Sequence, residues 1–192
     1  MVWDKEIGVN EKSRVLFPAE QLNVLYEHCR RKLQEKYLAG ESRERKAFGL
    51  IAGFREGSDL AVARCVPLLQ NARQAEPYKK IMDRVMAQHA VPSETPFAKR
   101  GWVADPGELL AQTEALQQQG LMLLGVYHMH RVPWENDPHR DRPTELDTIL
   151  GAGSRMLMFI VSLVDSDRPL IRSFYEGDPG REVPIVVSAT SG

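Results

Sequence analysis

Apolar residues recur at three- and four-residue intervals near the start of the chain, a spacing typical of an amphipathic α-helix. This stripe predicts a helix of about five turns after a short strand at residues 15–17. Pro18 suits the first turn of that helix, because proline has no amide hydrogen to leave unpaired there, and Gly40 is the expected stop. The residues of the stripe are Leu22, Leu25, Tyr26, Cys29, Leu33 and Tyr37.

Short apolar runs bounded by turn residues predict strands further along the chain. The first two runs flank Gly57-Ser58-Asp59, so we expect them to pair as a hairpin. The expected strands are residues 47–54, 60–68, 121–128, 156–164 and 170–175.

Further helices are predicted between these strands. Helical spacing of apolar residues indicates helices at residues 78–88 and 107–119, and a short helix begins at Thr144. The apolar faces contain Ile81, Met82, Val85 and Met86 in the first helix and Leu109, Leu110, Thr113 and Leu116 in the second. The mixture of helices and strands predicts an α/β fold with a mixed, curved sheet flanked by helices.

The length of 192 residues suits a single domain. We expect this domain over residues 13–176, between a polar N-terminal segment of residues 1–12 and a polar tail of residues 177–192. The net charge of −1 gives no indication of nucleic acid or an anionic membrane surface as a partner. No apolar run approaches the ~18–20 residues that a membrane-spanning helix needs.

Cys29 and Cys65 lie in unrelated elements, so we expect two buried free thiols, as in a protein of the reducing cytoplasm. The N-terminal residues lack the basic start and apolar core of a secretion signal. A cytoplasmic location is therefore expected.

Two histidines one residue apart follow an apolar run. Residues 121–127 lead directly into His128-Met129-His130. Because residues i and i+2 of a strand point to the same face, both imidazoles should project together, with Met129 facing the core.

A carboxylate follows the histidine pair after a polar loop. Asp147 falls in the first turn of the helix that begins at Thr144. Two neutral imidazoles and one carboxylate make a three-ligand zinc site with a fourth position open for water, as in catalytic zinc sites. We therefore expect His128, His130 and Asp147 to bind Zn²⁺. Simpler roles are open as well, with Thr144 as an N-cap and Asp147 as a charge favoured at the start of a helix.

These residues resemble the signature of the JAMM (MPN+) metallopeptidases, which is Glu, then His-x-His, then Ser-x-x-Asp. His128-Met129-His130 matches the histidine pair, and Thr144-Glu145-Leu146-Asp147 matches Ser-x-x-Asp with threonine in place of serine. The flanking segments 47–53, 66–71 and 156–174 are also similar to strands of the family.

The resemblance implies a deaminase-like JAMM/MPN sandwich and a zinc enzyme that hydrolyses a peptide or isopeptide bond. The implied substrate is the carboxyl-terminal tail of a ubiquitin-like or sulfur-carrier protein, bound extended along a sheet edge beside the metal. In the family the serine hydroxyl stabilises charge on the reacting carbonyl oxygen, and this role would fall to Thr144.

Lys46 occupies the position of the family's glutamate, which acts as the general base. A protonated lysine cannot accept a proton, and its charge disfavours a nearby metal ion. Glu44 lies two residues back on the same strand face, roughly 6.6 Å further along, and would reach the metal only through a bulge or turn. Three interpretations stay open: a degenerate site, Glu44 as the base, or a lysine neutralised by burial.

Other functions are open at this stage. A chain that lost its base could be a non-catalytic binding module or scaffold, as in other MPN proteins. A zinc deaminase needs His-x-Glu and Pro-Cys-x-x-Cys, and neither cysteine here has that spacing.

Two segments are longer than the family usually has, an insertion at about residues 75–100 and the loop 131–143. We expect Trp134 to form part of the cleft wall. His139 is a solvated loop residue or an additional ligand, and His28 and His89 are expected on helix surfaces.

Overall fold

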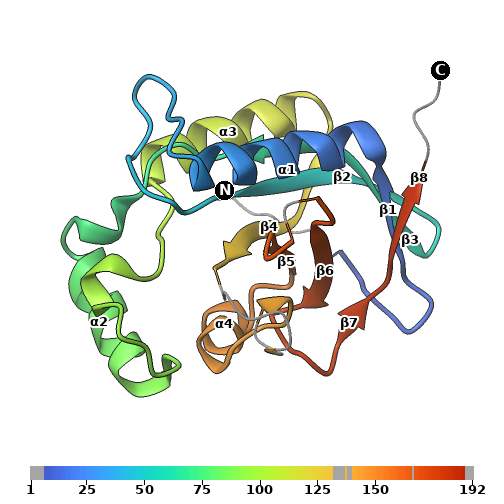
Figure 1. Ribbon diagram of the computed structural model, residues 1–192. Coiled ribbons are helices and arrows are strands. Elements are labelled where there is room, and N and C mark those ends of the chain that lie inside the picture. Colours follow the sequence, from blue (N-terminus) through green and yellow to red (C-terminus); the bar gives the residue numbers. More distant parts are fainter. Residues whose placement is uncertain (1–6, 132–136, 138–139, 166, 189–192) are drawn as a thin grey trace.

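Eight strands form one mixed sheet in the order β7-β6-β5-β4-β2-β3-β1-β8 (Figure 1). The computed structural model describes residues 7–131, 137, 140–165 and 167–188. The strands are β1 Val15–Pro18, β2 Phe48–Glu56, β3 Asp59–Pro67, β4 Met122–His130, β5 Leu157–Ser162, β6 Leu170–Tyr175, β7 Glu182–Val183 and β8 Ile185–Ser188. The α-helices are α1 Ala19–Leu33, α2 Tyr78–His89, α3 Pro106–Gln118 and α4 Glu145–Gly151, and 3₁₀ turns occupy Ala72–Gln74 and Phe97–Lys99.

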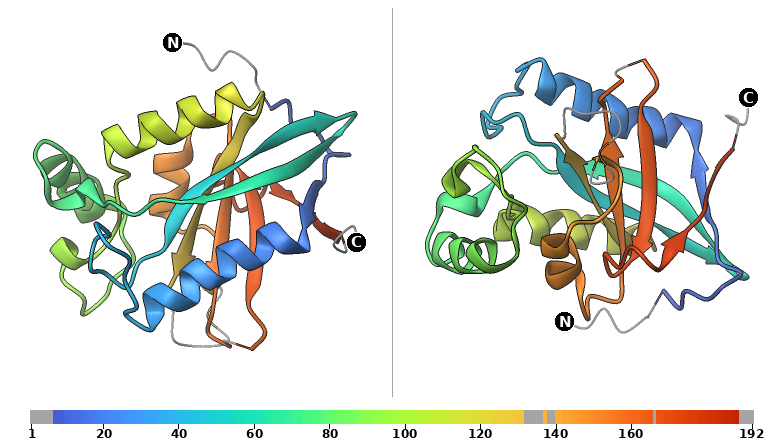
Figure 2. Two further views of the ribbon diagram at one scale, coloured as in Figure 1. Left: turned by 90° about the horizontal axis from the view of Figure 1, so that it is seen from above. Right: turned by 60° about the horizontal axis from the view of Figure 1, so that its bottom comes forward.

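The sheet curves until it is nearly closed and barrel-like. Strands β7 and β8 lie at opposite ends of the strand order, yet Pro184 alone separates them in the chain. Because consecutive Cα atoms are about 3.8 Å apart, the two edges must approach each other. The two views in Figure 2 show this curvature.

The expected polar tail at residues 177–192 instead contains strands β7 and β8. β8 pairs in parallel with β1, and Val183 is buried in the core. The amide of Val15 donates to the carbonyl oxygen of Pro184 at 2.8 Å, which holds the turn between β7 and β8 against β1. Val183 is buried and Ile185 packs partly buried against the core, whereas Val186 and Val187 are exposed, so burial at 183 and 185 together with the pairing to β1 orders this segment. At the other end of the chain Ile7, expected in a polar segment, is also part of the core.

α1 is shorter than expected and ends at Leu33, not near Gly40. Glu35 takes a left-handed φ of 59°, and the amides of Glu35 and Lys36 donate to the carbonyl oxygens of Lys32 and Arg31. These two bonds form a Schellman motif, which ends a helix by satisfying its last carbonyl groups. Tyr37 therefore lies outside the helix.

The remaining predicted elements are present with small shifts at their ends. β2 and β3 form the expected hairpin, with Gly57 at a φ of 61° in its turn. The predicted apolar faces of α2 and α3 are only partly buried. Ile81 of α2 is 55% exposed and Leu110 of α3 is 51% exposed. Met82, Met86 and Leu116 are buried as expected.

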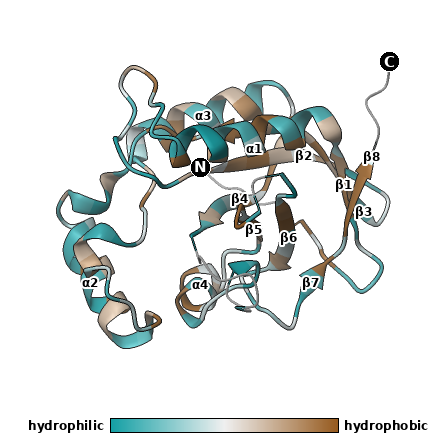
Figure 3. Ribbon diagram, viewed as in Figure 1, coloured by the Kyte–Doolittle hydropathy of each residue, from teal (hydrophilic) through white to brown (hydrophobic). Residues whose placement is uncertain are grey.

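α1 and α3 pack on opposite faces of the sheet around β2 and β4 (Figure 2, left). The larger core lies under α1 and includes Phe17, Leu25, Tyr127 and Phe159. Leu116 of α3 packs over the other face. In Figure 3 hydrophobic residues follow the strands, whereas the segment around α2 has mostly hydrophilic residues.

Cys29 and Cys65 are buried free thiols, as expected. Among the described residues, no helix is both long and apolar enough to cross a membrane.

Candidate metal centre

Strand β4 presents the two histidines on one face. Its side chains alternate, so Tyr127 and Met129 enter the core under α1 while His128 and His130 point to the opposite side. β4 lies between β2 and β5 and is paired on both sides, which fixes the register of both histidines.

Asp147 is aimed by the start of α4. The hydroxyl and the amide of Thr144 each donate to Oδ2 of Asp147 at 2.7 Å, and the amide of Asp147 lies 3.3 Å from the Thr144 hydroxyl oxygen. This reciprocal arrangement is a capping box, which satisfies free amides at the helix start and fixes the Asp147 side chain. The N-cap role of Thr144 is therefore confirmed, and its hydroxyl proton is directed at Asp147.

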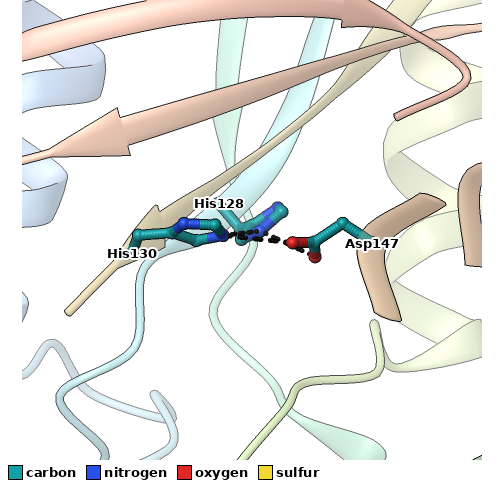
Figure 4. Close-up of side chains that lie close together, drawn as sticks. All are labelled: His128, His130 and Asp147. Carbon is teal, nitrogen blue, oxygen red and sulfur yellow. Dashed lines mark hydrogen bonds and ion pairs between the residues drawn. The ribbon is translucent and has the colours of Figure 1, made fainter. Parts of the chain in front are cut away.

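The three predicted ligands converge on one point (Figure 4). Nε2 of His128 lies 2.9 Å from Nε2 of His130, and these atoms lie 3.3 Å from Oδ1 and Oδ2 of Asp147 respectively. A tetrahedral zinc ion with bonds of about 2.0–2.2 Å holds its ligand atoms roughly 3.3–3.5 Å apart. Each histidine Nε2 thus lies at this spacing from one oxygen of Asp147, with a different oxygen facing each ring, and one ligand atom from each residue lies within 4.8 Å of the others.

Aromatic packing orients His128. Its ring lies 5.8 Å from the ring of Trp102, which stacks on Phe48 at 4.7 Å. Metal-bound histidines usually donate their second N–H to a carboxylate or carbonyl. Nδ1 of His128 is buried and has no such partner among the described residues, so packing holds this ring.

The protonation states also suit a metal. Burial lowers the pKa of His128, although Asp147 opposes this shift. Burial alone would raise the pKa of Asp147, but the charge and hydrogen bonds of the two imidazoles outweigh it and hold that pKa well below its usual range. A neutral imidazole and an ionised carboxylate are the forms that bind metal ions.

Lys46, and not Glu44, faces the metal centre. Phe48 pairs with His128 across β2 and β4, and the amide of Met129 donates to the carbonyl oxygen of Ala47, so Lys46 comes directly before the stretch that runs beside the histidine strand. Lys46 lines the cavity, with its Nζ 2.7 Å from Oε2 of Glu44.

The carboxylate of Glu44 also accepts from the side chain of Asn71 at 2.9 Å, and Glu44 does not line the cavity. Residues 44–46 are not part of β2, so the spacing expected along a strand does not apply to them. The structure therefore does not bring the candidate base Glu44 to the metal centre.

The histidines and Asp147 lie in a cavity of about 660 Å³ between α4 and the insertion that carries α2. The insertion supplies the apolar residues Met82 and Met86 to the wall, and Trp102, just after the insertion, adds a third. An ion pair of 2.7 Å between His89 of α2 and Glu145 of α4 links the two sides.

The ligand strand is not at a sheet edge, because the outermost strands are β7 and β8. The expectation that a peptide binds along a sheet edge beside the metal therefore does not concern β4 itself and stays a prediction, and the cavity is an open surface next to the three candidate ligands. Trp134 and His139, for which roles were predicted, lie outside the described residues.

The sequence reasoning missed a buried polar network behind the metal centre. His28, expected on a helix surface, is 3% exposed, and its Nδ1 lies 2.7 Å from the hydroxyl of Tyr127. Glu41 has a fully buried side chain that pairs with Arg31 and lies 3.5 Å from Nζ of Lys32. The network ties α1 to the segment that carries Lys46, and the charged residues at 31, 32 and 41 were its signal in the sequence.

Comparison with known proteins supports the fold alone. The chain matches no protein-family model and no curated protein. A protein from Desulfitobacterium hafniense has a solution structure that matches with a TM-score of 0.52 and 20% identity over 91% of this chain and 93% of that one. One from Salinibacter ruber matches with a TM-score of 0.47 and 17% identity over 93% and 94% of the two chains. The first match indicates a shared α/β fold, and the second is too distant to carry an argument.

Proposed function

We propose that this protein is a zinc-dependent, JAMM-type peptidase or isopeptidase that hydrolyses a bond at the tail of a ubiquitin-like or sulfur-carrier protein. The convergence of His128, His130 and Asp147, whose ligand atoms all lie within 4.8 Å of one another, carries the proposal. The substrate class and the JAMM/MPN sandwich come from the resemblance of the motif residues.

The roles of the side chains follow from their positions. His128, His130 and Asp147 would hold Zn²⁺, which lowers the pKa of a bound water toward ~7 and polarises a carbonyl group. The hydroxyl of Thr144 positions Asp147, and it would have to turn away from that carboxylate to contact a reacting oxygen.

The first test measures zinc per chain after purification without a chelator. We expect close to one equivalent, and His128→Ala should remove it. His89→Ala is the matched control, because His89 lies outside the three-residue cluster and should not affect the zinc content. A wild-type protein that takes up no zinc when the metal is added would refute the proposal.

The second test concerns the base. General-base catalysis typically contributes ~10²–10⁴-fold. If the wild type is inactive, Lys46→Glu should raise cleavage of a ubiquitin-like fusion by at least about a hundredfold. If the wild type is active with Glu44 as base, Glu44→Gln should remove most of the activity. Hydrolysis that neither substitution changes would mean that another group is the base.

A second candidate function is a non-catalytic binding module. The ion pair between Lys46 and Glu44 favours it, because both side chains that could stand at the base position are engaged with each other. A stable partner complex that persists after chelation, together with an inactive Lys46→Glu variant, would support this function.

A further inference from the structure

The charged lining of the cavity is mainly basic. Among the described residues, the cavity wall contains the acidic side chains Asp137 and Asp147 and the basic side chains Lys46, Lys99, Arg100 and Arg131. Asp147 belongs to the metal centre, and Lys46 is neutralised by Glu44. A bound divalent cation would make the cavity more positive still, so its chemistry favours an anionic ligand.

Arg100 has an unused donor at this wall. Its Nη2 donates to the carbonyl oxygen of Val91 at 2.7 Å, while its Nη1 is buried with no hydrogen-bond partner among the described residues. Burial lowers the pKa of Arg100, and no described carboxylate counteracts the shift. A buried, unpaired guanidinium donor is costly, and a carboxylate is the partner whose geometry matches it.

The insertion holds Arg100 in place. Arg73 is fully buried and donates from Nε to the carbonyl oxygen of Arg100 at 3.2 Å, and it pairs with Asp83 of α2. The guanidinium of Arg100 also lies 5.7 Å from the ring centre of Phe97. These contacts fix the position of the unused donor before any ligand binds, which reduces the entropic cost of binding.

Apolar side chains surround the same part of the wall. A Cβ atom placed on Gly101 would lie 3.2 Å from Cε of Met82 and 3.5 Å from Sδ of Met86, so α2 packs directly beside Arg100. Methionine side chains adapt to varied apolar groups. A ligand that carries an apolar group next to its anionic group would fit this wall.

Arg131 adds a second cation to the cavity wall. It follows His130 directly and is exposed. Within the described part of the chain it has no ion pair with a carboxylate. Its exposed charge contributes to the positive potential near the metal ligands.

We propose that Arg100 is a carboxylate-binding residue of this cavity, and that the ligand is a peptide whose apolar last residue ends in a free α-carboxylate. The inference deepens the proposed function, because it places the carboxyl end of the substrate against the insertion, with the bond to be cleaved towards the metal ligands. The subsite itself needs no metal.

The test compares two probes on the full chain, N-acetylglycyl-phenylalanine and the same compound with a carboxyl-terminal amide. Isothermal titration calorimetry is done with zinc-loaded and with chelator-treated protein. We expect the carboxylate to bind at least about tenfold more tightly than the amide in both forms, the effect of one charge-assisted hydrogen bond. Arg100→Gln should remove this preference, and Arg84→Gln, at an exposed position of α2 outside the cavity wall, should retain it.

Further variants keep the test decisive. Arg100→Lys keeps the charge without the guanidinium fork and should retain part of the preference, and Arg131→Gln should weaken carboxylate binding less than Arg100→Gln does. Equal affinity of the two probes for the wild type would overturn the inference. A preference that requires zinc and survives Arg100→Gln would also overturn it, because the carboxylate would then be bound by the metal. If the protein binds no zinc but still binds the carboxylate probe more tightly than the amide, the proposed zinc enzyme is refuted and the Arg100 subsite is supported.

Discussion

Mild acid should destabilise the protein through His28, although this residue lies outside the metal centre. Burial, together with the charges of Arg31 and Lys32, lowers the pKa of His28 to about 4 from its ordinary value of 6.5, against the opposing effect of Glu41. Because the folded pKa is depressed, the neutral ring contributes its full stability above pH 6.5. This contribution is lost as the pH falls towards 4, since the unfolded chain binds a proton that the folded protein does not.

The magnitude follows from these two values. At about pH 5, roughly 1.5 units below the unfolded pKa, the difference in proton binding destabilises the folded state by about 2 kcal/mol relative to pH ~7.5. That loss is a large part of the ~5–15 kcal/mol by which a domain of this kind is stable. Glu41 contributes little in this interval, because its folded pKa of about 2 lies below its ordinary 4.5, and both lie below pH 5.

The assay is urea unfolding of the wild type and His28→Gln at both pH values, with chelator present so that metal binding does not contribute. Glutamine can accept the hydrogen bond of Tyr127 but does not titrate. We expect the wild type to lose about 2 kcal/mol more than the variant between the two pH values. Equal losses in the wild type and His28→Gln would refute the reasoning.

Three further predictions concern the fold and the metal centre. Glu41→Gln should destabilise the protein by about 3–5 kcal/mol in urea unfolding, because it leaves the charges of Arg31 and Lys32 without their buried partner. Gly125→Ala should lower the midpoint of thermal unfolding, since a Cβ atom there would lie 2.0 Å from the carbonyl oxygen of Leu157, and overpacking of this kind costs about 1–3 kcal/mol or more. Thr144→Val should weaken zinc binding by about 10–100-fold in a competition titration, because it removes the hydroxyl that orients Asp147; an unchanged affinity would show that the capping box does not set the ligand geometry.

The strands and the metal-ligand pattern were predictable because both depend on local periodicity. Alternation along β4 is enough to place His128 and His130 on one face and Met129 in the core. A capping residue three positions before Asp147 is enough to place that carboxylate on the first turn of α4. That the two elements bring these three side chains together was an expectation from the motif, and in the structure each histidine Nε2 lies 3.3 Å from an oxygen of Asp147.

Only the tertiary structure decided the features that depend on distant partners. α1 ends at Leu33, and Arg31 near its end bonds both the carbonyl oxygen of Lys36 and the Glu41 carboxylate, so the apolar stripe alone overestimates its length. His28 is buried because Tyr127 and Glu41 come from other elements to meet it.

Dependence on distant parts of the chain also explains why the sequence misplaced Glu44 and missed the strands near the carboxyl end. The chain before β2 leaves the extended conformation, so a position counted along a strand could not place Glu44, and Lys46 takes the position at the cavity. β8 is stable only because closure of the sheet brings it to β1, which begins 170 residues earlier (185 − 15). Periodicity in a sequence determines which face a residue occupies, whereas long-range packing determines what that face meets.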